Sequence, residues 1–460
     1  MDEKAVLLML LVVLALGCTS RKEGTCEKDS QCSGAEVCFE GSCMKVKEVE
    51  AIKKKRVEDA KPKVCKDGDG DGARAGSGCP EGEPLDCDDA NDKMSPGRTE
   101  VCDRVDNDCD GQINEDLKGC VRTLFGGATW GSQATHRLDN PHDLLVDRDG
   151  TLLLTDDNHL WRVHLDGRVE LVAGSALSNF AEGQGAEARF SHPLGLALAP
   201  DGGYYLADCK NNCVRKVSRS GVTSTVAGLC STLTKNTGQY MDGPASQARF
   251  YCPSDVAVAP DSTLVVVDRG NARIRRIAVD GTVTTIAGVG PVEIEEGEGQ
   301  MGFKDGPTHE ARFNDPQSVL VDPAGIIYVS ESFNCRIRRI DLAKGEHGEV
   351  STLAGESNTL LGEGGYADGV GPKAQFSYPH GMVFDAKGNL LVADTGNAVI
   401  RQVSPQGRVA TIYGKPGQAE YVDGPVSQVR FKTPTDLACG PDGSLFVVDA
   451  GVNRLRWIVP

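Results

Sequence analysis

The chain has 460 residues and a formal net charge of −17. That length allows a large core plus accessory modules. The negative charge argues against nucleic acid as a partner, because phosphate contacts need clustered Lys and Arg side chains.

The N-terminal residues are typical of an export signal. Residues 5–17 form an apolar run that is too short for a membrane-spanning helix and suits the hydrophobic region of a signal peptide. The run ends in Leu-Ala-Leu-Gly-Cys, which resembles a bacterial lipobox. The resemblance implies cleavage after residue 17, lipidation of Cys18 and anchoring in the envelope, with Thr19 favouring the outer membrane. Ordinary secretion, with Cys18 removed, is the alternative.

Two cysteine-rich modules are expected next, at residues 18–44 and 64–120, with a charged linker at residues 45–63 between them. The second module carries sixteen Asp and Glu against six Lys and Arg, so it holds −10 of the net charge. Four and then six closely spaced cysteines predict disulfide frameworks formed in an oxidising compartment. The C-x₂-C pairs of structural zinc sites are missing from both clusters.

The acidic module also carries a pattern of alternating carboxylates. Asp67, Asp69 and Asp71 are followed by Gly72, as in the opening of a calcium loop, and Asp106, Asp108 and Asp110 precede Gly111 in the same way. An EF-hand is excluded because Gly78 stands where it would need Glu. Hard oxygen ligands favour Ca²⁺ over soft metals. The alternative is an acidic disulfide-bonded spacer that holds no ion.

Residues 86–116 resemble a metal-binding repeat of bacterial cell-surface proteins. The resemblance rests on the segments DCDD, PG, EVCD, DNDCDG and the final NED. It implies further ligands, namely Asp86, Asp88, Asp89 and Glu115. Arg104 and Asn114 depart from the repeat's usual glycine and aspartate.

A repeat dominates the remainder of the chain. Six similar segments begin at prolines, at Pro141, Pro193, Pro253, Pro316, Pro379 and Pro434. Within each, short apolar or alternating stretches are separated by turn residues, which predicts four antiparallel strands joined by hairpins. Six such units favour an all-β, six-bladed β-propeller at residues 121–460. An open solenoid is the alternative, but no capping repeats are visible.

The repeats resemble the NHL family, on segments such as GNARIRRIAVDGTVTTIAG and ADTGNAVIRQV. Asp208, Asp268, Asp394 and Asp449 are expected to end second strands and to satisfy turn amides. Arg-Phe pairs ahead of the prolines (Arg189-Phe190 and its equivalents, with Gln375 replacing Arg once) are expected to lock neighbouring blades together.

Residues 121–126 have the pattern of a fourth strand, whereas the sixth repeat ends after three. The sequence therefore predicts that this N-terminal strand completes the last blade and closes the ring.

Strand direction places every long connection on one face of the propeller. These connections are residues 174–192, 228–252, 288–315, 355–378 and 414–433. Loops on one side of a rigid scaffold favour binding, so a protein, peptide or glycan ligand is expected on this insertion face. An acidic stretch within them, residues 292–299, is interpreted as solvated loop.

Polar residues follow the repeat prolines, and we expect them at the mouth of the central channel. They are His142, Asp143, Asp255, His380 and Asp436, with His192 just before another proline. A solvated polar mouth is one interpretation. Because histidines at such a mouth hold zinc in related propellers, the alternative is a Zn²⁺-dependent hydrolase or lyase. No other catalytic motif is apparent.

The remaining cysteines favour two bridges, Cys209 with Cys213 and Cys230 with Cys252. Cys335 and Cys439 are expected to remain single. Taken together, the sequence predicts an exported lipoprotein that binds or scaffolds through its propeller rather than an enzyme.

Overall fold

The computed structural model describes residues 36–39, 42–45, 119–126, 138–166, 168–230, 240–289, 302–356 and 364–459. Lipidation at Cys18 and all proposed metal ligands from Asp67 to Glu115 lie outside these residues. The N-terminal unit contributes one described hairpin, β1 (Glu36–Phe39) and β2 (Ser42–Lys45). No described helix has the length and hydropathy needed to cross a bilayer.

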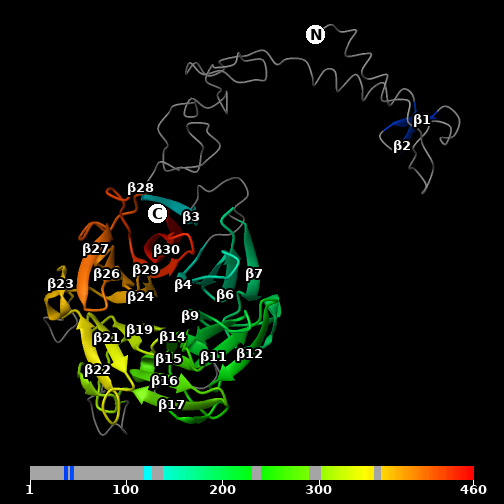
Figure 1. Cartoon of the computed structure of the whole chain (residues 1–460). Coiled ribbons are helices and arrows are strands. Elements are labelled where there is room, and N and C mark those ends of the chain that lie inside the picture. Colours follow the sequence, from blue (N-terminus) through cyan, green and yellow to red (C-terminus); the bar gives the residue numbers. More distant parts are fainter. Residues whose placement is uncertain are drawn as a thin grey trace. The chain divides into compact units, whose positions relative to one another are not determined.

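Six antiparallel sheets surround a central axis (Figure 1). Blade 1 comprises β4 (Pro141–Val146), β5 (Leu152–Asp156), β6 (His159–Val163) and β7 (Val169–Gly174). Blade 2 comprises β8 (Gly183–Gln184), β9 (Pro193–Leu198), β10 (Tyr204–Asp208), β11 (Cys213–Val217) and β12 (Val222–Ala227). Blade 3 comprises β13 (Gly243–Pro244), β14 (Pro253–Val258), β15 (Leu264–Asp268), β16 (Arg273–Ile277) and β17 (Thr282–Ala287).

The second half of the ring repeats this arrangement. Blade 4 comprises β18 (Gly306–Pro307), β19 (Pro316–Val321), β20 (Ile327–Glu331), β21 (Arg336–Asp341) and β22 (Glu349–Ala354). Blade 5 comprises β23 (Gly369–Val370), β24 (Pro379–Phe384), β25 (Leu390–Asp394), β26 (Val399–Val403) and β27 (Arg408–Gly414). Blade 6 comprises β28 (Gly424–Pro425), β29 (Pro434–Cys439), β30 (Leu445–Asp449), β31 (Arg454–Val459) and β3 (Cys120–Phe125).

The predicted ring closure is confirmed. Strand β3 pairs with β31 on one side, with Val121 opposite Ile458, and with β28 on the other. Val121 and Phe125 are almost completely buried, so the strand supplies core contacts as well as hydrogen bonds. Cys120, which begins β3, is disulfide-bonded. The two ends of the propeller therefore share one sheet.

The long connections do more than form loops on one face, as the sequence predicted, because each also contributes a short strand to a blade. Each runs to the outer edge of the following blade, where two of its residues pair with the fourth strand as a fifth strand. The chain then turns inward to the next first strand. Blades 2 to 6 thus have five strands rather than four, and the described parts of the connections are mostly ordered by main-chain pairing. The acidic stretch at 292–299 lies outside the described residues.

Six apolar clusters fill the six interfaces between neighbouring blades. A buried phenylalanine three residues before the first-strand proline lies in five of them; these are Phe190, Phe250, Phe313, Phe376 and Phe431. Leu138 takes this position between blades 6 and 1. The prediction that the Arg-Phe pairs join blades is therefore confirmed for the phenylalanine ring.

The residue before each phenylalanine contributes its carbonyl rather than its side chain. Arg249 O and Gln375 O each accept a hydrogen bond of 3.0 Å from a buried arginine of the third strand. Because the main chain makes the contact, glutamine at 375 serves as well as arginine.

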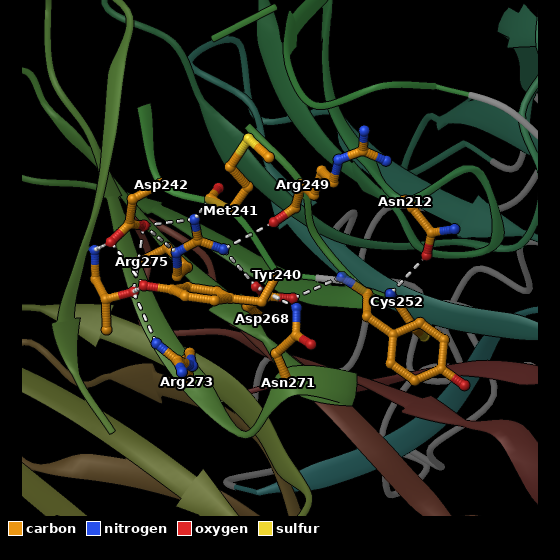
Figure 2. Close-up of polar contacts among 12 residues, drawn as sticks. Asn212, Tyr240, Met241, Asp242, Arg249, Cys252, Asp268, Asn271, Arg273 and Arg275 are labelled. Carbon is orange, nitrogen blue, oxygen red and sulfur yellow. Dashed lines mark hydrogen bonds and ion pairs between the residues drawn. The ribbon is translucent and has the colours of Figure 1, made fainter. Parts of the chain in front are cut away.

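Buried arginines of the third strands were not anticipated from the sequence. They are Arg215, Arg275, Arg338, Arg401 and Arg456, each with a relative exposure of 0%. Figure 2 shows the example in blade 3, where Nη1 of Arg275 donates to Asp268 at 2.6 Å. Nη2 donates to the Met241 carbonyl and to Asp242, at 2.8 and 2.6 Å. The rings of Tyr240 and Phe250 lie over the guanidinium.

The acidic partner at the end of the second strand has two roles. Asp268 also accepts the Tyr251 amide at 2.8 Å and the Asn271 side chain at 2.9 Å, so the predicted satisfaction of turn amides is confirmed. Glu331 has the same role in blade 4. Burial raises the pKa of the equivalent Asp208 to about 6 even beside Arg215. Desolvation therefore offsets much of the attraction, as is general for buried ion pairs.

Both predicted disulfide pairings are wrong. The bridges are Cys209–Cys252 and Cys213–Cys230. Cys209 lies in the 3₁₀ turn η4 (Cys209–Asn211) and faces the residue before Pro253 in the next blade, whereas Cys213 begins β11. The two cysteines that flank this turn therefore form disulfides with different segments of the chain. Cys335 and Cys439 form no disulfide, as predicted.

Removing residues 121–126 from the full chain should lower the melting temperature of the propeller substantially, because blade 6 loses a central strand. Calorimetry of this deletion measures the loss. A six-residue deletion in the linker, residues 46–51, is the control and should leave the propeller transition in place. An unchanged transition in the first deletion would refute closure by β3.

Arg275→Met should destabilise the protein by about 3–5 kcal/mol, because it leaves the Asp268 carboxylate buried without its counter-charge. The neighbouring Arg276→Met is the matched control. Arg276 pairs with Asp261 at the surface, and loss of such a pair costs about 0–1 kcal/mol. Denaturant unfolding distinguishes them, and equal losses would contradict the role given to the buried guanidinium.

Candidate binding site at the channel mouth

The first strands of all six blades line the central channel, which encloses a cavity of about 340 Å³. The walls are mainly aliphatic, with residues such as Leu198, Val258 and Val321. Polar groups enter from the third position of three first strands, where Asp143, Asp255 and Asp436 stand. Blades 2, 4 and 5 place Gly195, Ser318 and Gly381 there. The channel thus has an apolar body and a ring of carboxyl groups near one end.

The three carboxyl groups join neighbouring first strands, which share no ladder hydrogen bonds. Asp436 accepts the Leu144 amide of blade 1 at 2.8 Å, and Asp255 accepts the Val319 amide of blade 4 at the same distance. Asp143 accepts the Leu196 amide of blade 2. Each contact satisfies a main-chain donor that faces the channel, so the carboxyl groups hold the inner ring together.

Two glycines make room for these contacts. A Cβ atom at Gly195 would overlap the carboxylate of Asp255, and one at Gly381 would overlap that of Asp436. Glycine at the third position of blades 2 and 5, each just before a blade that carries aspartate there, is therefore a packing requirement.

The carboxyl groups do not all ionise at neutral pH. The side chains of Asp143 and Asp436 hydrogen-bond to each other. Burial, and then the neighbouring charge of Asp436, raises the pKa of Asp143 well above its usual range. Burial raises the pKa of Asp436 to about 7, and burial also raises the pKa of Asp255. Asp143 and Asp436 therefore share a proton at neutral pH.

Histidines lie just outside this ring. The rings of His142 and His192 meet edge to face, with centroids 4.5 Å apart, and the Asn140 amide lies 2.9 Å from Nε2 of His142. Burial and then the charge of His192 lower the pKa of His142 to about 3, and His380, Arg269 and Lys210 act in the same direction. Burial lowers the pKa of His380 to about 4. All three imidazoles are neutral at physiological pH, since the pKa of His192 is also lowered by burial.

The rim of the mouth has an unusual backbone. His192, Cys252, Asp315 and Tyr378 each precede a first-strand proline and have φ of 53°, 46°, 54° and 50°. This left-handed conformation is costly for residues other than glycine, and a following proline disfavours helical backbone further. Strain of this kind persists only where surrounding contacts impose it.

Each strained residue is held by the preceding blade, but by different chemistry. Cys209 binds Cys252 through the disulfide. Arg269 donates to Asp315 at 2.6 Å. The rings of Phe333 and Tyr378 meet with centroids 6.1 Å apart. The His142–His192 contact takes this place between blades 1 and 2, together with a hydrogen bond of 3.1 Å from the His192 amide to Asn158.

The structure brings together part of the predicted propeller site. Asp143 and Asp436 are in contact, and His142 and His380 lie near enough to interact electrostatically. Across the described ranges, no group of three or more His, Cys, Asp or Glu side chains is arranged to hold a metal ion. Lys210, Arg269, Phe333 and Tyr378 at the rim were missed. Their only sequence signal is their place in the turn after the second strand or just before the proline.

Asp436→Asn should remove a pH dependence of stability. The folded-state pKa of about 7 lies above the ordinary value of 3.8, so this group's contribution is present at low pH and is lost as pH rises through about 7. Between about pH 4 and 7 the wild type should lose up to about 1.4 kcal/mol per pH unit relative to the variant, and above about pH 7 the two curves should run parallel. Calorimetry across this range measures the difference. The exposed-turn variant Asp280→Asn should follow the wild type, and parallel curves for all three proteins below about pH 7 would contradict the raised pKa.

Three family profiles match the sequence. The Teneurin NHL domain matches residues 132–278, the NHL repeat matches residues 376–402, and a family described as "Putative metal-binding motif" matches residues 86–115. The last match covers Asp86, Asp88, Asp89, Asp106, Asp108, Asp110 and Glu115, but not Asp67, Asp69 or Asp71.

Curated relatives share the repeat region. NHL repeat-containing protein 2 from Homo sapiens is 25% identical over 346 residues, covering 68% of this chain and 45% of the relative. Protein SUPPRESSOR OF QUENCHING 1, chloroplastic, from Arabidopsis thaliana is 27% identical over 250 residues, covering 51% of this chain and 23% of the relative. The chain thus spans less than half the length of these relatives.

Solved structures share the fold. A structural genomics protein of unknown function from Bacteroides thetaiotaomicron aligns with a TM-score of 0.53 at 18% identity, covering 75% of this chain and 76% of that one. An auxiliary nutrient binding protein from the same organism aligns with a TM-score of 0.52 at 16% identity, with the same coverage. From its closed ring of blades and these matches, the chain is a six-bladed β-propeller that contains an NHL repeat, and residues 86–115, which precede the propeller in sequence, match the metal-binding motif family.

Proposed function

We propose that this protein is an exported, lipid-anchored envelope protein that binds a soluble ligand at the channel mouth of its propeller. The observation that carries the proposal is the convergence of polar and aromatic side chains from several blades over the channel cavity, on strained backbone. Backbone strain concentrates where function requires a fixed geometry, and pockets that combine apolar walls with a few convergent polar groups are typical of small-ligand sites.

The remaining support comes from the sequence and from the comparisons. The cysteine-rich modules and the apolar N-terminal run favour export, with lipidation at Cys18. A neighbour of the same fold is called an auxiliary nutrient binding protein, which is in line with a ligand-binding role for this chain. A protein, peptide or glycan partner would dock on the same face, where the aromatic pair Phe333 and Tyr378 is exposed.

The N-terminal motif is proposed to bind Ca²⁺. Its donors are carboxylates at alternate positions, the set that Ca²⁺ prefers, while the cysteines are expected to be oxidised and so unavailable to softer metals. This role is separate from the propeller and serves to order the segment between the membrane anchor and the ring.

A ligand screen by thermal shift tests the binding proposal. Compounds that raise the melting temperature of the wild type should fail to do so with His142→Asn, because the imidazole lies at the mouth beside the ring of carboxyl groups. The matched control is His309→Asn. His309 also contacts a histidine edge to face, His347 at 4.7 Å, but on the connection to the outer strand of blade 4. Ligands that shift both variants equally, or an extended panel with no ligand at all, would contradict the proposal.

Calorimetric titration of the full chain with CaCl₂ tests the metal proposal. Binding should be lost when Asp106, Asp108 and Asp110 are replaced together by Asn, since each replacement removes an anionic oxygen. Tighter binding of Cu²⁺ or Zn²⁺ than of Ca²⁺ would overturn the choice of metal.

A further inference from the structure

Basic side chains from four blades converge on the channel mouth of a protein that is acidic as a whole. His142 comes from β4 of blade 1, His192 and Lys210 from blade 2, Arg269 from the turn η5 (Arg269–Asn271) of blade 3, and His380 from β24 of blade 5. After burial, the other four groups each lower the pKa of His142, which places all of them near its imidazole. Lys210 and Arg269 bring positive charge to this mouth, while the three imidazoles are neutral and can donate or accept hydrogen bonds.

The carboxylates near the mouth already have partners within the protein. Asp315 is already paired with Arg269 and also accepts Nε2 of Gln317 at 2.6 Å. Asp157 acts to raise the pKa of His192. Its carboxylate accepts a hydrogen bond of 3.0 Å from the side-chain amide of Asn158. Asp143 and Asp436 lie further along the channel and share a proton, and their oxygens accept main-chain amides. The acidic groups are thus engaged in contacts within the protein.

Two basic groups at the mouth remain open to a ligand. Lys210 is exposed, and among the described residues its ammonium group has no hydrogen-bond partner. The ring nitrogens of His192 also make no hydrogen bond to any described residue, although the ring is half-buried against His142. Together with the Asn140 amide, these groups form a set of donors facing one entrance.

We propose that the mouth binds a small anionic ligand, a carboxylate or phosphate, between Lys210, His192 and His142, with Arg269 providing further positive charge nearby. The inference rests on the proposed ligand-binding role and names the class of ligand. The anionic group occupies the entrance, and an aliphatic portion of the ligand extends into the channel, whose walls are apolar beyond the ring of carboxyl groups. Anions with a short aliphatic body fit this arrangement best.

The test uses the full chain and two defined anions, inorganic phosphate and succinate, in calorimetric titrations at low and high salt. The wild type should bind at least one of them, with affinity that falls as NaCl rises, because part of the attraction is screened charge. Lys210→Gln should weaken binding by about tenfold or more, since a charge-assisted hydrogen bond is lost. Lys210→Arg should restore most of it. Lys373→Gln, an exposed lysine in the 3₁₀ turn η6 (Gly371–Lys373) beside the outer strand of blade 5, should bind as the wild type does.

The outcomes separate this inference from the broader proposal. If neutral sugars or peptides bind and His142→Asn abolishes their binding, while both anions fail to bind, the mouth is a binding site but not for anions. Equal anion affinities in the wild type and Lys210→Gln would also overturn the inference, because binding would then be adventitious. If no compound of any class binds, the proposed function fails together with it.

Discussion

A buried guanidinium at the middle of the third strand is the interaction on which this propeller most depends. In five blades it joins three pieces of chain that lie 7, 34 and 26 residues before it in sequence. These are the end of the second strand through Asp or Glu, the outer fifth strand through an aspartate or a carbonyl, and the inward turn through the carbonyl before the buried phenylalanine. A hydrophobic side chain at this site would leave those acceptors unsatisfied inside the protein, at a cost of several kcal/mol (about 3–5). The arginine therefore fixes the path of each connection, and through it the placement of the next blade.

Blade 1 is the exception, and its difference bears on function. It carries Trp161 at the register position of the arginine, and its second and third strands are joined by a two-residue turn in place of the 3₁₀ turn found in blades 2, 3, 5 and 6. Asn158 of this short turn accepts the main-chain amide of His192 at 3.1 Å. The rim between blades 1 and 2 is thus held by this hydrogen bond and by two neutral imidazoles, where the other rim contacts are a disulfide, an ion pair and an aromatic pair.

The fold could be predicted from sequence because period and turn chemistry are local. The repeat pattern predicted the strands, the prolines that start them and the missing fourth strand of the last repeat. The closing role of β3 followed from counting the strands. The fifth strands could not be predicted, because each has only two residues and its partner lies about forty residues away in sequence in blades 2 to 5, and at the other end of the propeller in blade 6. The disulfide pairings failed for a similar reason. Cys209 and Cys213 are neighbours in sequence, but the turn directs them to different blades.

The site was predicted in part. Counting from the prolines found the residues that face the channel, namely His142, Asp143, Asp255, His380 and Asp436. It could not show that the aspartates bind amides of neighbouring blades, because those contacts depend on how closely the first strands approach. Lys210 and Arg269 occupy turns whose polar residues look like ordinary solvated surface, and only the closed ring shows that they face the same entrance. A crystal of the full chain grown with selenate as a phosphate analogue, with anomalous data collected at the selenium edge, tests the account most directly. The account predicts an anomalous peak at the channel mouth beside Lys210 and His142. Selenate bound only elsewhere on the propeller, with the mouth empty, would contradict it.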